Sequence, residues 1–260
     1  MRPRIVLAKS LIRLGHFISS LPVMVMRPDD LVEFGRQNYA RPEGIQYWGN
    51  DDYVSLGLTA VEKTLLKKTN LTQGNVLVLC LGGGREAIPL AKMGFSVTGV
   101  DYIPELVKIA QENAAKQGVL LNAQVGEFIH FVPPPSTFNL IWLSDRMYSS
   151  VATRRKRIEV LNRMHTSLVP GGWFICGFCW LPSNEFSPRV ERMRKLVAYL
   201  SRGNLCYEAG DKLFGQFIHT YGDKSELASE FTAGGFTLTA LHLPQDPGDT
   251  TGAALLHKAV

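Results

Sequence analysis

The sequence predicts an α/β fold with a mostly parallel sheet, preceded by a helical N-terminal segment. After Asn70, short apolar runs that resemble strands alternate with longer stretches that have apolar residues at helical spacing. The stretch VLVLCLGGGREAIPLA at 76–91 adds the pattern of a buried strand, a glycine loop and a helix. Such an alternation predicts β-α-β units, right-handed crossovers and a parallel sheet.

Each element follows from the local pattern, in order along the chain. Apolar runs bounded by turn-forming residues predict strands, and apolar residues at helical spacing predict helices. The expected strands are 75–81, 95–100, 119–125, 138–143, 172–179, 215–221, 236–243 and 252–258. The expected helices are 51–69, 85–93, 104–117, 153–168, 188–201 and 223–233. A long mixed stretch at 180–215 interrupts the rhythm as an insertion on the substrate side.

An amphipathic, basic helix is expected at about 3–21, ending near Pro22 because proline interrupts helices. At 100° per residue, one face carries Arg2, Lys9, Arg13, His16 and Ser20. The opposite face carries Leu7, Leu11, Leu14, Ile18 and Leu21. Two interpretations remain open: a lid or dimer helix whose leucines pack on protein, or an interfacial helix that lies on anionic lipid. A secretory signal does not fit, since Arg13 interrupts the apolar region.

The chain is expected to have two parts. Residues 1–70 form a helical N-terminal cap, of which 28–50 are polar and aromatic with the sequence YWG at 47–49. Residues 71–260 form the α/β domain, including the insertion at 180–215. A length of 260 residues suffices for a sizeable core.

Composition excludes several classes of protein. No run of eighteen uninterrupted apolar residues occurs, so a membrane-spanning helix is not expected. The net charge of +5 is explained by a solvated surface, and no nucleic-acid partner is favoured. Cys176 and Cys179 form a C-x-x-C without a second pair, so no metal site is expected. These features favour a cytoplasmic protein, peripheral at the inner face of the membrane if the first helix binds lipid, and a homodimer stays open.

The glycine loop by itself fits two cofactors. Glycines allow close approach of a ligand, and the following helix offers free N–H groups to a negatively charged group. A second strand ends at Asp101, seventeen residues beyond Gly84, where a carboxylate can accept both hydroxyls of a ribose. Both NAD(P) and S-adenosylmethionine carry that ribose, so the choice between them stays open at this point.

The surroundings of the loop resemble one family. A helical cap precedes the first strand, SLVPGG at 167–172 joins a helix to a strand, and SELASEFTAGGFTLTALH at 225–242 has the pattern of a helix, a glycine turn and a strand. Over about residues 45–258 this order is similar to the class I S-adenosylmethionine-dependent methyltransferases, in particular bacterial small-molecule members with a helical N-terminal cap. The resemblance implies a Rossmann-like fold with a seven-stranded, mostly parallel sheet whose last strand is antiparallel. It also implies S-adenosyl-L-methionine as cofactor.

Cofactor-binding positions follow from the same resemblance. Gly82, Gly83 and Gly84 would form the loop, and Asp101 would bind the ribose, with Tyr102 and Ile103 beside the adenine. Gly126, Glu127 and Phe128 would follow the third strand, with Glu127 accepting the adenine amino group. Leu143 and Ser144 would border the methionine part.

Two positions of the loop depart from the family pattern. The usual acid and the first glycine are replaced by Val78 and Cys80. In the family that acid helps to orient the methionine end of the cofactor. Glu86 or Asp145 could hold the ammonium group instead.

Methyl transfer from a sulfonium is an in-line displacement, so catalysis comes mainly from positioning. A hydroxyl or carboxyl acceptor can also need a base, for which Asp145 and His219 are the candidates. Tyr148 and Tyr221 could orient the acceptor. The sequence SDRM at 144–147 is not the N/D-P-P-Y/F of amino methyltransferases for DNA bases, and no cysteine stands where a covalent base methyltransferase needs one.

The expected activity is therefore methyl transfer from S-adenosylmethionine to oxygen or nitrogen of a small or lipid-like acceptor. Two alternatives remain. The chain could be an NAD(P)-dependent oxidoreductase, or a catalytically degenerate binding protein that kept the methyltransferase fold after losing the loop acid.

Overall fold

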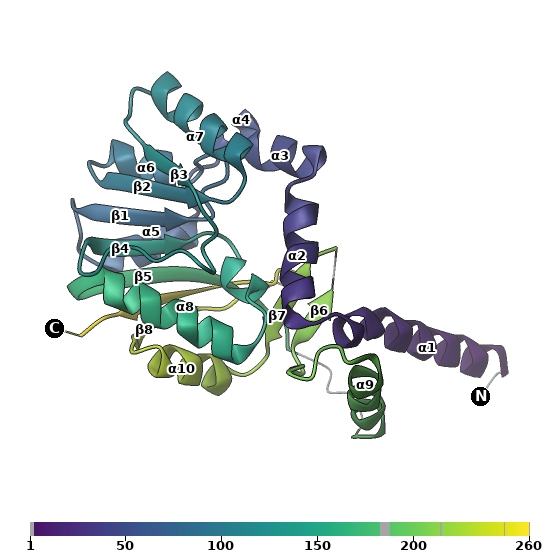
Figure 1. Ribbon diagram of the computed structural model, residues 1–260. Coiled ribbons are helices and arrows are strands. Elements are labelled where there is room, and N and C mark those ends of the chain that lie inside the picture. The colour runs from purple at the N-terminus through teal and green to yellow at the C-terminus, as the bar shows by residue number, and fades with distance from the viewer. Residues whose placement is uncertain (1–2, 183–187, 214, 247, 260) are drawn as a thin grey trace.

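The computed structural model describes residues 3–182, 188–213, 215–246 and 248–259, and it builds them around one large sheet (Figure 1). Seven strands pair in the order β3-β2-β1-β4-β5-β9-β8. Their bounds are β1 (Asn75–Leu79), β2 (Ser96–Asp101), β3 (Asn122–Val125), β4 (Phe138–Leu143), β5 (Leu168–Trp180), β8 (Thr237–His242) and β9 (Thr251–His257). The last strand, β9, runs antiparallel to β5 and β8, whereas β1 to β5 pair in parallel. The predicted mostly parallel sheet with an antiparallel last strand is confirmed.

A short hairpin extends this sheet beyond the prediction. It consists of β6 (Asp211–Leu213) and β7 (Phe217–Tyr221), of which only the second was expected. β7 pairs in parallel with the end of the long β5, where Cys179 and Trp180 face Thr220 and Tyr221. The hairpin therefore lies at the carboxyl end of the parallel strands, where α/β folds bind ligands.

Helices cover both faces of the sheet. On one face, α8 (Arg154–Ser167) and α10 (Lys224–Ala233) pack Leu161, Met164, Leu227 and Phe231 against the strands. On the other, α5 (Ala60–Lys68), α6 (Ala87–Lys92) and α7 (Pro104–Lys116) contribute buried apolar residues such as Leu65, Leu90 and Ala110. The two buried clusters explain why strands such as Val76–Leu79 are apolar without alternation, since both of their faces are covered.

Four further helices precede α5: α1 (Pro3–Val25), α2 (Pro28–Tyr39), α3 (Pro42–Gly49) and α4 (Asp51–Ser55). The predicted end of the first helix near Pro22 is wrong, because α1 continues to Val25. Proline removes one hydrogen bond, but the burial of Val23 and Met24 holds the final turn in place. Arg2 lies outside the described residues, as do the side chains of Arg13 and His16.

The single helix expected at 51–69 is two helices. Gly57 has φ +58°, which breaks the α-helical path after α4. Thr59 then starts α5 with a reciprocal cap, in which its hydroxyl accepts from Glu62 N–H and its own N–H donates to the Glu62 carboxylate. The break turns α5 onto the sheet.

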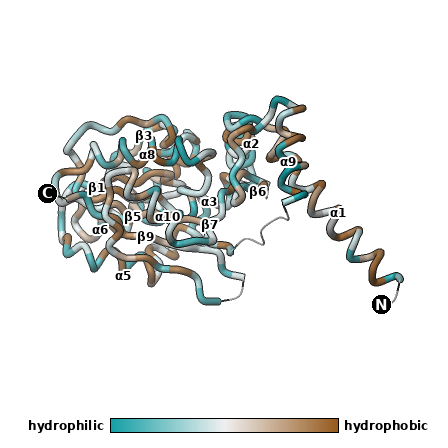
Figure 2. The backbone as a smooth tube through the Cα atoms, turned by 90° about the horizontal axis from the view of Figure 1, so that it is seen from below, coloured by the Kyte–Doolittle hydropathy of each residue, from teal (hydrophilic) through white to brown (hydrophobic). Residues whose placement is uncertain are grey.

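The N-terminal cap and the insertion at 180–215 meet in a separate small core. Val23 and Met24 of α1, Leu31 of α2, Ala198 of α9 (Pro188–Ser201) and Phe217 of β7 pack together there. Beyond this core the N-terminal part of α1 projects away from the body in both views (Figures 1 and 2). No helix among the described residues is long and apolar enough to cross a membrane.

Candidate active site

A pocket lies at the carboxyl ends of β1, β2 and β4, under the helical cap. Its floor comes from the segments that follow these strands, and its roof comes from aromatic side chains of α2, α3 and α4 and from the β6–β7 hairpin. The lining includes Tyr39, Trp48, Tyr53, Cys80, Gly82, Arg85, Glu86, Asp101, Tyr102, Ile103, Ser144, Asp145, Arg146, Met147, Gln216 and Ile218. Most of the predicted cofactor positions on the first, second and fourth strands thus meet in one place.

Asp101 joins the ends of β1 and β2. Its Oδ2 accepts the Gly82 N–H at 2.8 Å and its Oδ1 accepts the Ile103 N–H at 3.0 Å. Burial raises the pKa of Asp101, and these two backbone hydrogen bonds oppose that rise. Each carboxylate oxygen has a second lone pair, so the group can still accept hydroxyls of a ligand.

The three glycines of the loop have different surroundings. Gly82 has φ +54° and lines the pocket. A Cβ on Gly83 would lie 2.7 Å from Val54 Cγ2 and 2.8 Å from the Trp48 carbonyl oxygen, so this residue lets the cap approach the loop. Gly84 has φ +100° and packs on Ile88. Gly82 therefore faces the predicted ligand, whereas Gly83 and Gly84 have a conformational and packing role.

The predicted adenine side lies next to α2. Tyr102 donates its hydroxyl hydrogen to the Arg36 carbonyl oxygen at 3.1 Å, and the Arg36 guanidinium lies 5.5 Å from the Tyr102 ring centroid. Arg36 Nε also lies 3.6 Å from Glu127 Oε1. Glu127 and Phe128 line a hollow that adjoins the main pocket and shares Tyr102 with it.

Gly126 and Leu143 lie next to the main pocket but do not line it. The Gly126 N–H donates to the Asp101 carbonyl oxygen at 2.8 Å, which aligns β3 with β2. Leu143 is buried at the end of β4 and borders a second hollow, which shares Asp145 with the main pocket. The adenine, ribose and methionine roles of these residues remain predictions from the resemblance.

Two carboxyl groups line the pocket although the loop acid is missing. Val78 is fully buried within the sheet, but Glu86 and Asp145 both line the pocket. Glu86 lies against Arg85, whose guanidinium is bonded to both oxygens of Glu62 at 3.0 and 2.8 Å. Burial raises the pKa of Glu86 to about 7, while Arg85 acts in the opposite direction.

Asp145 has an unusual backbone conformation for a residue at this edge. Its φ is +42°, in the left-handed region that asparagine and aspartate tolerate better than most residues. The turn directs it into both the main pocket and the second hollow, with Arg146 Nε 3.8 Å from its Oδ2. Of the two predicted bases, Asp145 and His219, it is Asp145 that lines the pocket.

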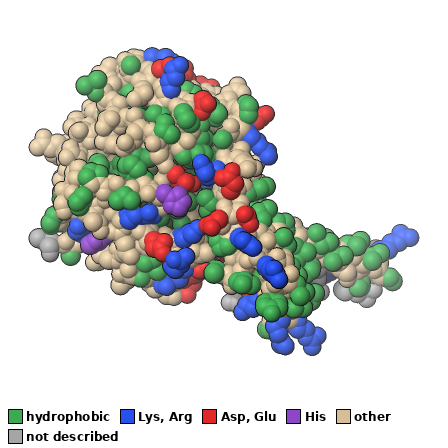
Figure 3. Space-filling model, viewed as in Figure 1, with side chains coloured by type: hydrophobic (Ala, Val, Ile, Leu, Met, Phe, Trp, Pro, Cys, Tyr) green, Lys and Arg blue, Asp and Glu red, His purple; other side chains and the backbone are tan. Residues whose placement is uncertain are grey.

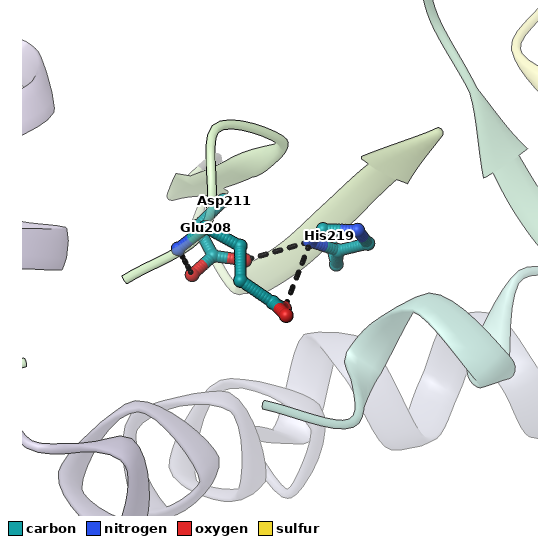
Figure 4. Close-up of side chains that lie close together, drawn as sticks. All are labelled: Glu208, Asp211 and His219. Atoms are coloured by element: carbon teal, nitrogen blue, oxygen red, sulfur yellow. Dashed lines mark hydrogen bonds and ion pairs between the residues drawn. The ribbon is translucent and has the colours of Figure 1, made fainter. Parts of the chain in front are cut away.

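The placement of Tyr148 and His219 at the acceptor is wrong. Tyr148 is fully buried and donates its hydroxyl hydrogen to Glu230 Oε2 at 2.8 Å. His219 is buried too, with its Nδ1 2.8 Å from Asp211 Oδ1 (Figure 4). Side chains alternate along β7, so Ile218 faces the pocket and His219 faces away from it. Tyr221 likewise donates to Glu230, at 2.8 Å.

His219, Glu208 and Asp211 lie close enough together to suggest a metal site (Figure 4). Their charges are already compensated, however. Arg157 Nη2 lies 2.8 Å from Glu208 Oε2, and the same guanidinium binds the buried Glu230. Burial alone lowers the pKa of His219, but the hydrogen bond to Asp211 and the Glu226 carboxylate 3.6 Å from Nε2 raise it overall. A divalent cation would face the Arg157 guanidinium, so this cluster is a structural network that joins the hairpin to α8 and α10.

A model of a methyltransferase domain matches residues 76–172. An S-adenosylmethionine-dependent methyltransferase from Methanosarcina mazei superposes with a TM-score of 0.61 at 17% identity, over 78% of this chain and 99% of that one. A TehB-like S-adenosylmethionine-dependent methyltransferase from Corynebacterium glutamicum superposes with a TM-score of 0.55 at 16% identity, over 84% of this chain and all of that one. At such identities the likeness concerns the fold.

One curated relative matches over a short segment. The 23S rRNA (uracil(1939)-C(5))-methyltransferase RlmD of Shewanella sediminis is 52% identical over 44 residues, which are 17% of this chain. The chain spans only 10% of that relative's length. The similarity is thus local.

Proposed function

We propose that this chain transfers the methyl group of S-adenosylmethionine to a small or lipid-like acceptor, since residues 76–172 match a methyltransferase domain and the fold is that of a solved S-adenosylmethionine-dependent methyltransferase. The methyl group would go to an oxygen or nitrogen atom of that acceptor. The observation that carries the proposal is that Gly82, Asp101, Glu86 and Asp145 line one pocket together with aromatic residues of the cap.

The residues of the cofactor side fit S-adenosylmethionine. Gly82 leaves open space beside the loop, because a Cβ there would meet nothing closer than 3.7 Å. Asp101 has lone pairs left for the ribose hydroxyls, and ionised Glu86 has the charge to hold the methionine ammonium. When bound, the cofactor supplies an electrophilic methyl group on a sulfonium.

Asp145 is the group that we propose acts on the acceptor. An ionised carboxylate accepts a proton from a hydroxyl or amine that it contacts, and so increases the nucleophilicity of the attacking atom. The surrounding walls hold the acceptor in line, which is the larger part of catalysis in a displacement of this kind.

The cap favours an apolar acceptor of limited width. Trp48 packs edge-on to Tyr53 at 5.1 Å and tilted to Tyr39 at 6.3 Å between ring centroids. All three rings line the pocket, and such rings bind flat or aliphatic groups by burying apolar area. A roof made of α2, α3 and α4 also suits a small molecule or a single chain better than a nucleic-acid duplex.

An RNA base is the competing acceptor, since the partial relative is an rRNA uracil methyltransferase by name. Covalent methylation of a base needs a reactive thiolate. Cys80 lines the pocket, but burial and the nearby Asp101, Glu86 and Glu127 carboxylates raise the pKa of its thiol well above the usual value. A thiol in such surroundings is a poor nucleophile, which supports the small or lipid-like acceptor.

The test has two stages. Calorimetric titration with S-adenosylhomocysteine, with NADH as the control, should show binding of the former alone; binding of NADH alone would support an oxidoreductase. Cofactor with a labelled methyl group is then incubated with the protein and with small-molecule, lipid or RNA fractions. We expect label in one of the first two fractions, and label in RNA alone would overturn the acceptor proposal.

A further inference from the structure

Two helices of the protruding part expose apolar side chains to solvent. We call this the α1–α9 surface and define it by Leu7, Leu11, Leu14 and Ile18 of α1 with Leu196 and Leu200 of α9. Each of these side chains is between 53% and 71% exposed. The four residues of α1 fall on one stripe at helical spacing, as do the two of α9.

The two stripes belong to helices that contact each other at the end of α1. The end of α1 packs on α9 through Met24 and Ala198 in the small third core. The Asn204 N–H, just after α9, donates to the Met24 carbonyl oxygen at 2.8 Å. In both backbone views α9 lies next to the C-terminal part of α1, and the N-terminal part of α1 extends beyond it (Figures 1 and 2).

The charge of this protrusion is almost entirely positive. Residues 3–25 contain no Asp or Glu, and the one acid of α9, Glu191, lies 3.8 Å from Arg194. Lys and Arg side chains accompany the hydrophobic ones over this region (Figure 3). Among the side chains that the structure describes in α1 and α9, the exposed basic ones are Arg4, Lys9, Arg189, Arg192 and Lys195.

We propose that the α1–α9 surface binds a bilayer that contains anionic lipid, with both helices lying in the interface. An exposed apolar stripe on a helix that also carries basic residues is the pattern of interfacial helices, whose leucines enter the acyl boundary while the long cationic side chains reach the headgroups. A second copy of this chain would bring the same positive charge to the contact and repel it, whereas anionic headgroups neutralise it. Charge therefore favours lipid as the occupant.

Both helices are connected to the pocket. α1 leads into α2, which carries Tyr39, and α9 precedes the hairpin that contributes Gln216 and Ile218. Binding at the α1–α9 surface would hold the pocket near the lipid, where a lipid-like acceptor is concentrated. This last consequence rests on the proposed function, but the lipid contact itself does not.

Vesicle binding tests the contact without cofactor or acceptor, so its outcome is independent of methyl transfer. The full chain is sedimented with phosphatidylcholine vesicles, with or without phosphatidylserine. We expect binding to the anionic vesicles only, and weaker binding as salt rises. The triple variant Leu7→Ser, Leu11→Ser, Leu14→Ser should bind at least about tenfold more weakly, because each serine removes apolar area that the leucine would bury in the bilayer.

The control variant is Leu120→Ser, which makes the same change at a leucine that is 95% exposed on the loop after α7. It should bind like the wild type. Equal binding of the triple variant and the wild type would overturn the proposal. A second outcome would also overturn it: the wild type does not bind vesicles, it forms a dimer in analytical ultracentrifugation, and the triple variant is a monomer. A second copy of the chain would then cover the surface.

Discussion

The Gly83 N–H donates a hydrogen bond to the Trp48 carbonyl oxygen over 3.1 Å. This bond joins the glycine loop of the sheet domain to the last turn of α3 in the cap. Val54 of α4 packs over the same glycine, so the loop and the roof of the pocket are in direct contact. The position of the roof therefore depends on the absence of a side chain at residue 83.

The variant Gly83→Ala should loosen the cap. Its Cβ would meet backbone atoms of Trp48 and Gly49 at 2.8 and 3.0 Å, which cannot be relieved by rotating a side chain. We expect the free energy of unfolding to fall by about 1–3 kcal/mol, the usual cost of overpacking. Urea denaturation measures it. Gly15→Ala, where a Cβ meets nothing within 4 Å, is the control and should not destabilise the protein.

The variant Asp101→Ala should lose cofactor binding. It removes the acceptor of the Gly82 and Ile103 N–H groups as well as the proposed ribose contact. The loss of two hydrogen bonds between the ribose hydroxyls and the charged carboxylate predicts a fall in S-adenosylhomocysteine affinity of about a hundredfold or more. Calorimetry measures it, with the exposed Asp246→Ala as control. Normal affinity in a folded Asp101→Ala protein would refute the ribose assignment.

Cofactor affinity should depend on pH through Glu86. Its folded pKa of about 7 lies above the ordinary value of 4.5, so the folded protein keeps this proton at pH values where the unfolded chain has lost it. Stability from this group therefore falls as the pH rises from 4.5 to about 7. Ionisation above that range supplies the charge for the ammonium, so S-adenosylhomocysteine should bind more tightly at about pH 8 than at about pH 6.

Glu86→Gln separates this effect from other titrations. The variant cannot ionise, so its affinity should be weak and should lack the rise between these pH values. If the variant keeps the same pH profile as the wild type, Glu86 does not hold the ammonium. Asp145→Asn, the other carboxyl group of the pocket, serves as the comparison.

Asp145→Asn should also affect turnover more than binding. The amide is nearly isosteric with the carboxylate but cannot accept a proton, so we expect kcat to fall by about a hundredfold with S-adenosylhomocysteine affinity unchanged. Steady-state kinetics with the identified acceptor gives the split between kcat and KM. A change in KM alone would mean that Asp145 only positions the acceptor.

Arg157→Met should be strongly destabilising. Arg157 and Glu230 are both fully buried and their charged atoms lie 2.8 Å apart, so the variant leaves the buried Glu230 carboxylate with the more distant and half-exposed Arg154 in place of a direct partner. The expected cost is about 3–5 kcal/mol. Arg155→Met breaks the exposed pair with Glu159 on the same helix and should cost at most about 0.5 kcal/mol. Equal thermal shifts would contradict the structural role of the Arg157 network.

Much of the fold was predictable because burial determines the local pattern of apolar residues in the sequence. Strands covered on both faces are continuously apolar, and α8, α9 and α10 begin and end within a residue or two of the expected positions. Asp101 and Gly82 were predictable for a similar reason, since the end of one strand and the glycine loop must face the same edge of a parallel sheet. β6 has only three residues, too few for a periodic pattern.

The acceptor side was less predictable. A sequence shows that GQFIHTY alternates, but not which face of the strand meets the pocket, and the structure assigns that face to Ile218 rather than His219. The missing acid at Val78 was visible at once. That Glu86 and Asp145 both line the pocket instead depends on how the loops after β1 and β4 pack.

The sequence by itself determined the order of strands and helices, the glycine loop and the carboxylate at the end of the second strand. These depend on propensities and on periods that span a few residues. Only the tertiary structure decided that Met24 of the cap packs with Ala198 and Phe217 of a segment far along the chain. The apolar character of a residue indicates that it is buried, but not which residues it packs against. For this reason the contact between cap and insertion, the roof of the pocket and the α1–α9 surface could be identified only in the folded chain.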